Sequence, residues 1–366
     1  MTKKIRVGVL FGGKSVEHEV SLLSAKNVMN ALDKDKYEIF MIGIDKNGEW
    51  HLRDGSDFLS CANHPKQIQM HSPKEKVMLV AKADETHLVS LSNSAVMHSL
   101  DVVFPVLHGT YGEDGSIQGL LKMAGIPFVG ASVLGSAIGM DKDVMKRLLR
   151  DAGIPIARFI TYHAVHREEI LFDQVVEELG IPLFIKPANC GSSVGVAKAT
   201  NASEFPAAIE KAFLYDRKIL VEEFVQGREI ECAVLGNDYP ITSLPGEVIP
   251  KDQFNSYDAK YVDDAGTLFK TPADLDPITA QNVQELAVRT FQVLCCEGMA
   301  RVDFFLKQDG QIFVNEINTI PGFTKLSMYP QLWQGSGHPF NEIVDRLIHL
   351  ARERHLKEQT LKTSVS

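Results

Sequence analysis

Apolar runs and helix-like segments alternate along the N-terminal part of the chain. Residues 5–11 form a continuous apolar run, which is typical of a strand buried in a parallel sheet. A glycine turn follows, and Ser15 is the predicted N-cap of the next helix. The pattern predicts, in order, a strand at 5–11, a helix at 15–32, strands at 37–44 and 101–107, and a helix at 116–124. This succession indicates a doubly wound parallel α/β unit that ends near Gly130.

Shorter elements follow between residues 131 and 228, around a glycine-rich loop. Asp141 is a predicted N-cap, and Gly153 closes the helix that begins after it. The loop at 187–195 joins two predicted strands rather than a strand and a helix. The predicted elements are helices at 142–152, 172–179 and 204–215, and strands at 159–162, 183–186, 194–199 and 218–225. We expect an α+β subdomain here.

The remaining residues predict a second α+β subdomain. It contains a strand at 229–235, a helix at 280–295, a hairpin near residue 310 and a helix at 341–358. The polar stretch 250–271 is longer than an ordinary connection, and we interpret it as a lid loop. A chain of 366 residues exceeds one comfortable core. The predicted domains are therefore 1–130, 131–228 and 229–366.

The predicted hairpin brings together side chains that could bind a cation. Asp309-Gly310 between two apolar runs is a strong signal for a two-residue turn. With that turn, Asp303 lies opposite Glu316 and Arg301 opposite Asn318, all on one face. Two carboxylates and an amide oxygen suit Mg²⁺ or Mn²⁺. The alternatives are an ordinary solvated face, or a three-residue loop that would move Glu316 to the opposite face.

Composition limits the classes of partner. The chain is 45% hydrophobic and 23% charged, as is ordinary for a globular protein. A net charge of −9 without a basic cluster argues against nucleic acid as a main partner. The five cysteines are odd in number and lack zinc-ligand spacing, which indicates reduced thiols in a cytoplasmic protein. Neither a signal core nor an 18-residue apolar run is present, so we expect no secretion and no membrane span.

Two glycine-rich segments could bind phosphate. Residues 8–15 match the Walker A pattern, but Val9, Leu10 and Phe11 belong inside the first strand and leave too short a turn to wrap a triphosphate. The loop at 186–195 is the better candidate, because its small residues allow a hairpin tip to close over phosphates. Lys186 at its start could reach an α-phosphate.

The strand end at 222–225 is the predicted adenine site. Its backbone N–H and C=O groups could bind the purine edge, and Glu229 could bind the ribose hydroxyls. An acidic edge strand without a ligand is the alternative interpretation.

Eight motifs in this order carry a family resemblance. They are GGKSVEHEVS at 12–21, HGTYGEDG at 108–115, MDK at 140–142, KP at 186–187 with GSSVG at 191–195, EE at 222–223, YDAKY at 257–261, RVD at 301–303 and NEINTIPG at 315–322. Together they resemble the ATP-grasp superfamily and, within it, the D-alanine–D-alanine ligase family. The resemblance covers nearly the whole chain.

The resemblance implies both architecture and reaction. The fold would be a three-domain ATP-grasp architecture, in which an N-terminal α/β (pre-ATP-grasp) domain precedes two α+β subdomains that sandwich ATP. ATP would phosphorylate the carboxylate of one D-alanine, and the amine of a second D-alanine would attack the acyl phosphate. The dipeptide would feed peptidoglycan synthesis. Relatives are commonly homodimers, which we adopt by analogy.

The resemblance also implies roles for the residues that contact the amino acids. Glu17 would hold the ammonium of the first D-alanine, and Ser192 and Tyr261 would join it in closing the lid. Ser327 would bind the carboxylate of the second D-alanine. His108 would lie near the attacking amine, either as a base or as a positioning group. Tyr261 in the lid favours an amine acceptor over lactate.

The remaining roles concern the nucleotide, the metal and the oxyanion. Arg301 and the backbone N–H of Gly322 would stabilise the developing oxyanion. Two Mg²⁺ ions, or Mn²⁺, would be held by Asp303, Glu316 and Asn318. The residues implied in ATP binding are Lys142, Lys186, Ser193, Glu222, Glu223, Phe224, Val225, Glu229, Lys260, Phe305 and Asn315.

Three rival functions remain open at this point. One is a different ATP-grasp carboxylate–amine ligase. Another is a P-loop kinase that uses Lys14, and the third is a nucleotide-binding sensor without catalysis.

Overall fold

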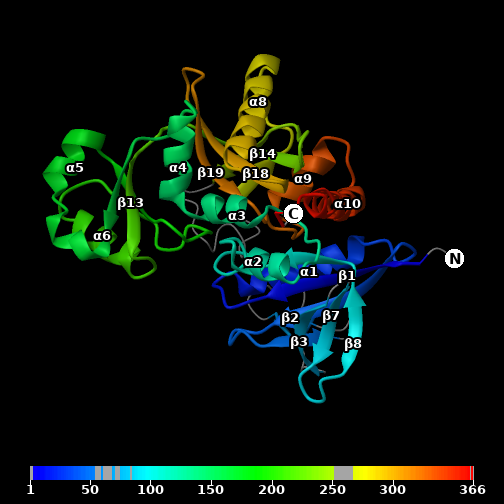
Figure 1. Cartoon of the computed structure of the whole chain (residues 1–366). Coiled ribbons are helices and arrows are strands. Elements are labelled where there is room, and N and C mark those ends of the chain that lie inside the picture. Colours follow the sequence, from blue (N-terminus) through cyan, green and yellow to red (C-terminus); the bar gives the residue numbers. More distant parts are fainter. Residues whose placement is uncertain are drawn as a thin grey trace.

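The described residues form three large sheets with helices packed against them, and one separate two-stranded sheet (Figure 1). The computed structural model describes residues 3–53, 59–60, 68–70, 75–82, 85–250, 267–362 and 364–365. The predicted lid therefore lies mostly outside the described residues, and so do Lys260 and Tyr261. Among the described helices, none is both long and apolar enough to cross a bilayer.

The first sheet has a parallel centre, as predicted. Its strands β1 (Ile5–Gly12), β2 (Tyr37–Ile44) and β9 (Val102–Val106) run parallel to one another, and helices α1 (His18–Ala31) and α2 (Ser116–Met123) belong to this unit. Helix α1 begins at His18 after Glu17, so the prediction of Ser15 as N-cap is wrong. Ser15 instead accepts the Glu17 N–H through its hydroxyl oxygen, at 3.1 Å.

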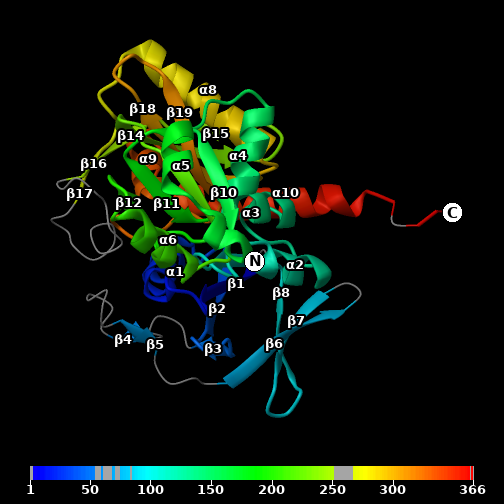
Figure 2. The same ribbon diagram turned by 90° about the vertical axis from the view of Figure 1, so that its left-hand side faces the viewer.

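An antiparallel wing extends this sheet, which the weak pattern of residues 52–100 did not predict. The order is β8-β7-β6-β3-β2-β1-β9, and β4 (Leu59–Ser60) pairs separately with β5 (Gln69–Met70). The wing strands are β3 (Trp50–Arg53), β6 (Glu75–Lys82), β7 (Glu85–Ser90) and β8 (Val96–Leu100). Figure 2 shows β6, β7 and β8 at the end of the molecule away from the other two sheets.

The second sheet forms the lobe at the left of Figure 1. Its antiparallel order is β10-β13-β11-β12. The strands are β10 (Phe159–His163), β11 (Leu183–Pro187), β12 (Ala197–Ala199) and β13 (Lys218–Glu223). The helical elements of this lobe are the 3₁₀ helix η1 (Ala164–Glu169), α5 (Phe172–Leu179) and α6 (Phe205–Phe213). Helices α3 (Val133–Met140) and α4 (Lys142–Asp151) precede this sheet in the chain, and their buried side chains pack in the core of the third sheet. The apolar faces of α5 and α6 supply the core of this lobe.

The third sheet has the order β17-β16-β14-β18-β19, with β15 paired to β14. Its strands are β14 (Arg228–Gly236), β15 (Ile241–Thr242), β16 (Gly246–Pro250), β17 (Thr267–Lys270), β18 (Gly298–Leu306) and β19 (Ile312–Asn318). The helices are α8 (Pro277–Val293), α9 (Met328–Gly335) and α10 (Phe340–Gln359). Helices α3 and α9 were not predicted from the sequence.

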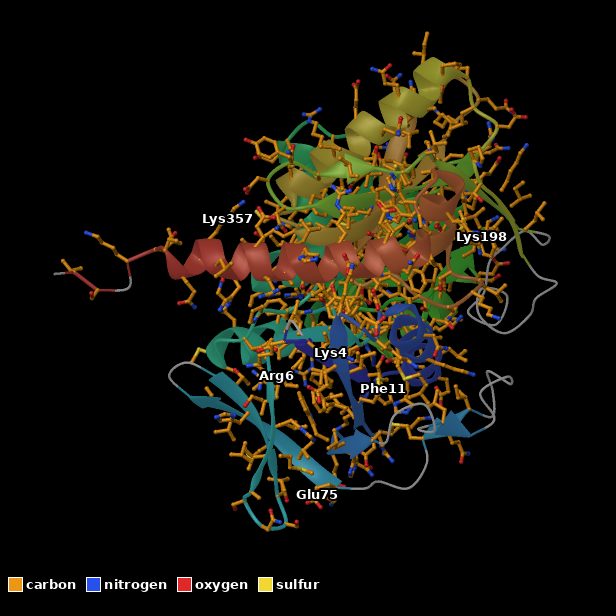
Figure 3. All side chains as sticks on the ribbon, turned by 90° about the vertical axis from the view of Figure 1, so that its right-hand side faces the viewer. Lys4, Arg6, Phe11, Glu75, Lys198 and Lys357 are labelled. Atoms are coloured by element: carbon orange, nitrogen blue, oxygen red, sulfur yellow. The ribbon has the colours of Figure 1, made fainter. Side chains whose placement is uncertain are left out.

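One apolar core joins the first and third sheets. Buried side chains of β1 and β9 cluster with Tyr329, Trp333 and Ile348 of α9 and α10. Arg354 of α10 is buried as well, and its guanidinium donates to the carbonyl oxygens of Gly130 at 2.6 Å and Phe128 at 2.8 Å. Figure 3 shows α10 running between the two parts, above Lys4 and Arg6 of the first unit. This shared core holds the loops of the first sheet against those of the third.

Candidate active site

The β18–β19 hairpin has the predicted pairs, but it reaches them by a different route. Arg301 lies opposite Asn318, and Asp303 lies opposite Glu316. The loop has three residues rather than two, because the Lys307 N–H donates to the Gln311 carbonyl at 2.9 Å. A three-residue loop alone would turn Glu316 to the other face.

A β-bulge at Asn315 restores the register. Phe304 pairs with Val314 while Asp303 pairs with Glu316, so Asn315 is the extra residue. The bulge also aims a side chain, since Asn315 Oδ1 lies 3.3 Å from Lys186 Nζ of the second sheet. The metal-ligand prediction for this hairpin thus depends on two irregularities that compensate one another.

Arg301 lies between two carboxylates on neighbouring strands. Its Nε and Nη2 donate to the two oxygens of Asp303, each at 2.7 Å, and Nε also lies 2.9 Å from Glu231 Oε2. Asn318 Nδ2 donates to Asp303 Oδ2 at 3.1 Å. Glu231 faces Asp303 across β14 and β18, and it was not among the residues predicted from the sequence. Its signal was the alternation of Glu229 and Glu231 with two buried residues along β14.

This hairpin face fits a divalent cation by its donor chemistry. Asp303 and Glu316 offer carboxylate oxygens from directly paired positions, and Asn318, two residues after Glu316, offers an amide oxygen. Hard divalent ions take such oxygen ligands, together with phosphates and water. Asp303 is 9% exposed, so its charge is costly to bury without a cationic partner.

Lys142 connects the helix of the second unit to this hairpin. Its Nζ lies 3.5 Å from Glu316 Oε2 and donates to the Cys190 carbonyl at 2.8 Å. Asp141 caps the helix as predicted, accepting from the N–H groups of Asp143 and Val144. The cap orients the first turn of α4, so Lys142 bridges the 187–195 loop and the metal-ligand candidates.

A buried row of charges lies beside the strand end where adenine binding was predicted. Glu222 is 2% exposed, and its carboxylate lies 2.7 Å from Lys186 Nζ and 3.3 Å from Lys146 Nζ. Burial alone would raise the pKa of Glu222, but the two ammonium groups outweigh it and hold the pKa below its usual value. Lys146 was missed, although its place one helical turn after Lys142 puts both on one face.

The other predicted adenine residues lie around the same strand end. Phe224 is half-exposed and stacks on Phe184, with ring centroids 5.8 Å apart. Lys198, labelled in Figure 3, lies 5.1 Å from the Phe224 ring centroid. Glu223 turns toward Arg158 Nε, at 2.7 Å, and therefore faces β10. Val225 follows the end of β13, and Glu229 pairs with Phe305 across β14 and β18.

Glu17 and the 187–195 loop meet across two units, as predicted for the substrate site. Ser192 Oγ donates to Glu17 Oε1, and Glu17 is 5% exposed. Ser192 and Ser193 hold φ values of 51° and 58°, a strained region for residues with a side chain. A Cβ on Gly191 would lie 3.0 Å from Glu17 Oε2, and a Cβ on Gly109 would clash with the same atom. The two glycines therefore let the loops close around this carboxylate.

Gly322 and Ser327 are also neighbours. A Cβ on Gly322 would lie 2.6 Å from Ser327 Oγ, so a side chain there would displace this hydroxyl. Ser327 Oγ accepts the Thr324 N–H at 3.0 Å and lies 2.8 Å from Thr324 Oγ1. These contacts position the hydroxyl at the start of α9.

His108 is buried, and both of its ring nitrogens are engaged. Nδ1 lies 2.9 Å from the Ile320 carbonyl and Nε2 lies 3.1 Å from Ser24 Oγ. Burial lowers the pKa of His108 to about 4, so the ring is neutral near pH 7. This geometry favours the positioning role and corrects the alternative of a free base beside the attacking amine.

The lowered pKa of His108 predicts a pH-dependent contribution to stability. The unfolded histidine takes up a proton near pH 6.5, while the folded one does so near pH 4. The contribution is complete above pH 6.5 and is lost as the pH falls toward 4. We expect it to decrease by about 2 kcal/mol between pH 7 and pH 5.

Urea unfolding of wild type and His108→Gln measures this contribution. The difference between their unfolding free energies should shrink by that amount from pH 7 to pH 5. Burial and the Glu17 charge raise the pKa of Glu113 to about 8, so the contribution of Glu113 to stability decreases as the pH rises, opposite to that of His108. Comparison of wild type with the variant cancels this contribution, because both proteins contain Glu113. A difference that stays constant over this range would contradict the prediction.

The Walker-like segment is not a phosphate loop. Val9, Leu10 and Phe11 lie inside β1 and are fully buried, as expected. Gly12 and Gly13 make the turn with φ values of 89° and 93°, and Lys14 is exposed. The structure therefore removes the main support for the P-loop kinase.

Comparison with known proteins decides the family. Residues 6–131 match the family model "D-ala D-ala ligase N-terminus", and residues 148–349 match "D-ala D-ala ligase C-terminus". The chain belongs to the D-alanine–D-alanine ligase family. Among its relatives is the D-alanine–D-alanine ligase of Shouchella clausii (strain KSM-K16), 52% identical over 365 residues, which are 100% of this chain and 99% of the relative. D-alanine–D-alanine ligase A of Escherichia coli (strain K12) is 49% identical over 363 residues, covering 99% of this chain and 100% of the relative.

Solved structures of D-alanine–D-alanine ligase relatives share the fold. The enzyme from Coxiella burnetii superposes with a TM-score of 0.84 at 39% identity, over 98% of this chain and 97% of that chain. The VanG D-Ala:D-Ser ligase from Enterococcus faecalis gives 0.81 at 36% identity, over 95% and 100% respectively. The predicted fold class, an ATP-grasp architecture with mixed α/β and α+β units, is confirmed.

Proposed function

We propose that this protein joins two D-alanines to D-alanyl-D-alanine at the expense of ATP, for peptidoglycan precursor synthesis. The observation that best supports this proposal is the β18–β19 hairpin, in which Arg301 lies opposite Asn318 and Asp303 lies opposite Glu316. The chain around it matches the ligase family models over residues 6–131 and 148–349. An acyl phosphate on the first D-alanine is the intermediate that this equipment suits, because an arginine and backbone N–H groups stabilise an oxyanion in acyl transfer.

ATP would lie between the second and third sheets. Lys142 and Lys186 would contact the phosphates, and Glu222 would hold Lys186 through their 2.7 Å ion pair. This pairing supports the assignment because a lysine held at one end is already oriented for a phosphate. The further proposed contacts are Ser193, Glu223, Phe224, Val225, Glu229, Phe305 and Asn315, together with Lys260, which lies outside the described residues.

Two Mg²⁺ ions, or Mn²⁺, would be held by Asp303, Glu316 and Asn318. When bound, these ions would neutralise the phosphate charges and polarise the transferring phosphoryl group. The arginine would then face the carbonyl oxygen of the acyl phosphate, beside the Gly322 N–H.

The amino acids would lie between the first and third sheets. Glu17, which accepts from Ser192, would bind the ammonium of the first D-alanine. Ser327 would bind the carboxylate of the second D-alanine. Tyr261 would complete the lid, and it lies outside the described residues.

Domain division, assembly and location complete the proposal. Residues 1–130, 131–228 and 229–366, with a lid at 250–271, would be the three domains. Each of the three large sheets draws its strands from one of these ranges, apart from Arg228 at the start of β14. We place the enzyme in the cytoplasm, where ATP is available, as a homodimer by analogy.

Substrate-dependent phosphate release tests the function. D-alanine should stimulate phosphate release from ATP strongly and L-alanine hardly at all, because the two enantiomers present the ammonium differently to Glu17. A nucleotide sensor would release no phosphate with either amino acid. Stimulation by a different carboxylate–amine pair alone would favour another ATP-grasp ligase. D-serine as the acceptor tests specificity, since a D-Ala:D-Ser ligase shares this fold.

A further inference from the structure

The loop from Thr319 to Phe323 is held almost entirely by the first unit of the chain. It follows Asn318 at the end of β19 and carries Gly322, whose N–H is the proposed oxyanion donor. Backbone groups on both sides of Gly322 bond to side chains of α1 and of the 108–113 segment. The third unit supplies the loop, and the first unit fixes its shape.

Two of these contacts, joined by a hydrogen bond between His108 and Ser24, form a hydrogen-bond chain of determined polarity. The Ile320 carbonyl can only accept, so His108 Nδ1 carries the proton and donates, at 2.9 Å. Nε2 of the neutral ring is then an acceptor, and the Ser24 hydroxyl donates a hydrogen bond to it at 3.1 Å. The Ser24 oxygen in turn accepts the Phe323 N–H, also at 3.1 Å. The chain thus runs from Phe323 through two side chains back to Ile320.

Two further side chains of the first unit, Glu113 and Asn27, also hold the 319–323 loop. Glu113 accepts the Ile320 N–H at 2.8 Å with one oxygen and the Gly109 N–H at 2.9 Å with the other. Asn27 Nδ2 donates to the Phe323 carbonyl at 2.9 Å. Both backbone groups of Ile320 and both of Phe323 are therefore bonded to the first unit. Pro321 and Gly322 lie between these two anchors, and proline restricts the backbone there further.

We propose that Ser24, Asn27 and Glu113 are positioning residues, which act with His108 to set the Gly322 N–H at the reacting carbonyl. This rests on the proposed function, in which Gly322 donates to the oxyanion. Ser24 is fully buried on α1 and touches the reaction only through the loop. An oxyanion donor works only when it is preorganised, and a misplacement of about 1 Å costs on the order of 10²-fold in rate.

The serines of α1 offer a matched test. Ser24 and Ser21 are both fully buried, one helical turn apart, and each makes two hydrogen bonds. Ser21 bonds to Gly12 and Val106, and not to the 319–323 loop. Ser24→Ala should lower kcat about tenfold and leave KM for ATP within about twofold. Ser21→Ala should lose similar thermal stability while keeping kcat.

A tetrahedral phosphinate analogue of the dipeptide provides a second readout. The Ser24→Ala variant should bind this analogue more weakly than the wild type, by the same factor by which its kcat/KM is reduced. Its affinity for ADP should equal that of the wild type. Asn27→Asp is the second loop variant, because it keeps the side-chain shape and loses the N–H that binds Phe323. Asn27→Asp should also lower kcat, and it tests the positioning role if Ser24→Ala does not fold.

The outcomes separate this inference from the proposed function. Equal kcat for Ser24→Ala and Ser21→Ala, with Asn27→Asp at wild-type kcat, would overturn the positioning role while the wild type still makes D-alanyl-D-alanine. A parallel loss of kcat, ATP affinity and stability in both serine variants would show a merely structural role and would also overturn it. A wild type that releases no phosphate with D-alanine would instead reject the proposed function.

Discussion

Asp303→Asn and Glu316→Gln should each lower metal-dependent phosphate release by about 10³-fold or more. Each substitution keeps the shape of the side chain and removes the charge that a divalent cation needs. The two carboxylates come from directly paired positions, so neither can replace the other. Asp303 also pairs with Arg301, so its substitution removes the bidentate contact of the guanidinium and keeps the contact with Glu231. The measurement is phosphate release at a series of Mg²⁺ concentrations.

Glu247→Gln on β16 is the matched control. Glu247 is 9% exposed, like Asp303, and it binds Arg228 through two contacts of 2.7 Å. This pair therefore reproduces the bidentate arginine–carboxylate contact in the same sheet, on β14 and β16, with an arginine side chain that is 40% exposed. We expect a loss of stability without a large loss of kcat. Near-normal release in both hairpin variants, with folding intact, would remove the basis of the mechanism.

Arg301→Lys should lower kcat by about 10²- to 10³-fold, the usual effect of losing an oxyanion donor. Lysine keeps the charge, but it cannot bridge both oxygens of Asp303 and also reach Glu231, as the guanidinium does. ATP binding should change little, because the contacts of Lys142 and Lys186 remain. Steady-state kinetics and equilibrium binding of ADP measure the two effects separately.

Arg228→Lys is the corresponding control for this variant. Arg228 makes the same bidentate contact with Glu247, so the substitution disturbs an equivalent ion pair. We expect its kcat to stay within about threefold of wild type, because the pair lies outside the reacting site. An Arg301→Lys enzyme with wild-type kcat, or one that loses only ADP affinity, would contradict the oxyanion role.

The local sequence pattern was sufficient to predict an element when the contacts of its residues lie within the same strand or helix. The β2 strand (Tyr37–Ile44) and the α5 helix (Phe172–Leu179) begin and end where the pattern predicts. Asp141 caps α4, because a cap depends on the next three residues alone. The Asp303–Glu316 pair was also predicted, although the predicted turn was wrong.

That hairpin illustrates what pattern cannot resolve. A three-residue loop and a bulge at Asn315 each shift the register by one, and together they cancel. At the bulge, Asn315 contacts Lys186 on another sheet, 129 residues away in sequence, and no local pattern encodes such a contact. The strands within residues 52–100 were likewise not predicted from the sequence. Strand preference in an antiparallel sheet depends on packing against neighbouring strands, which the local pattern does not show.

The sequence by itself determined the family, the order of the motifs and the residues that can carry charge or bind a cation, because these follow from residue type and spacing. Only the tertiary structure decided which of those groups meet. Glu231 faces Arg301, Lys146 faces Glu222, and His108 is enclosed between Ser24 and Ile320. Each of these contacts joins elements that are distant in the chain, and burial then sets the protonation state, as it does for the neutral His108.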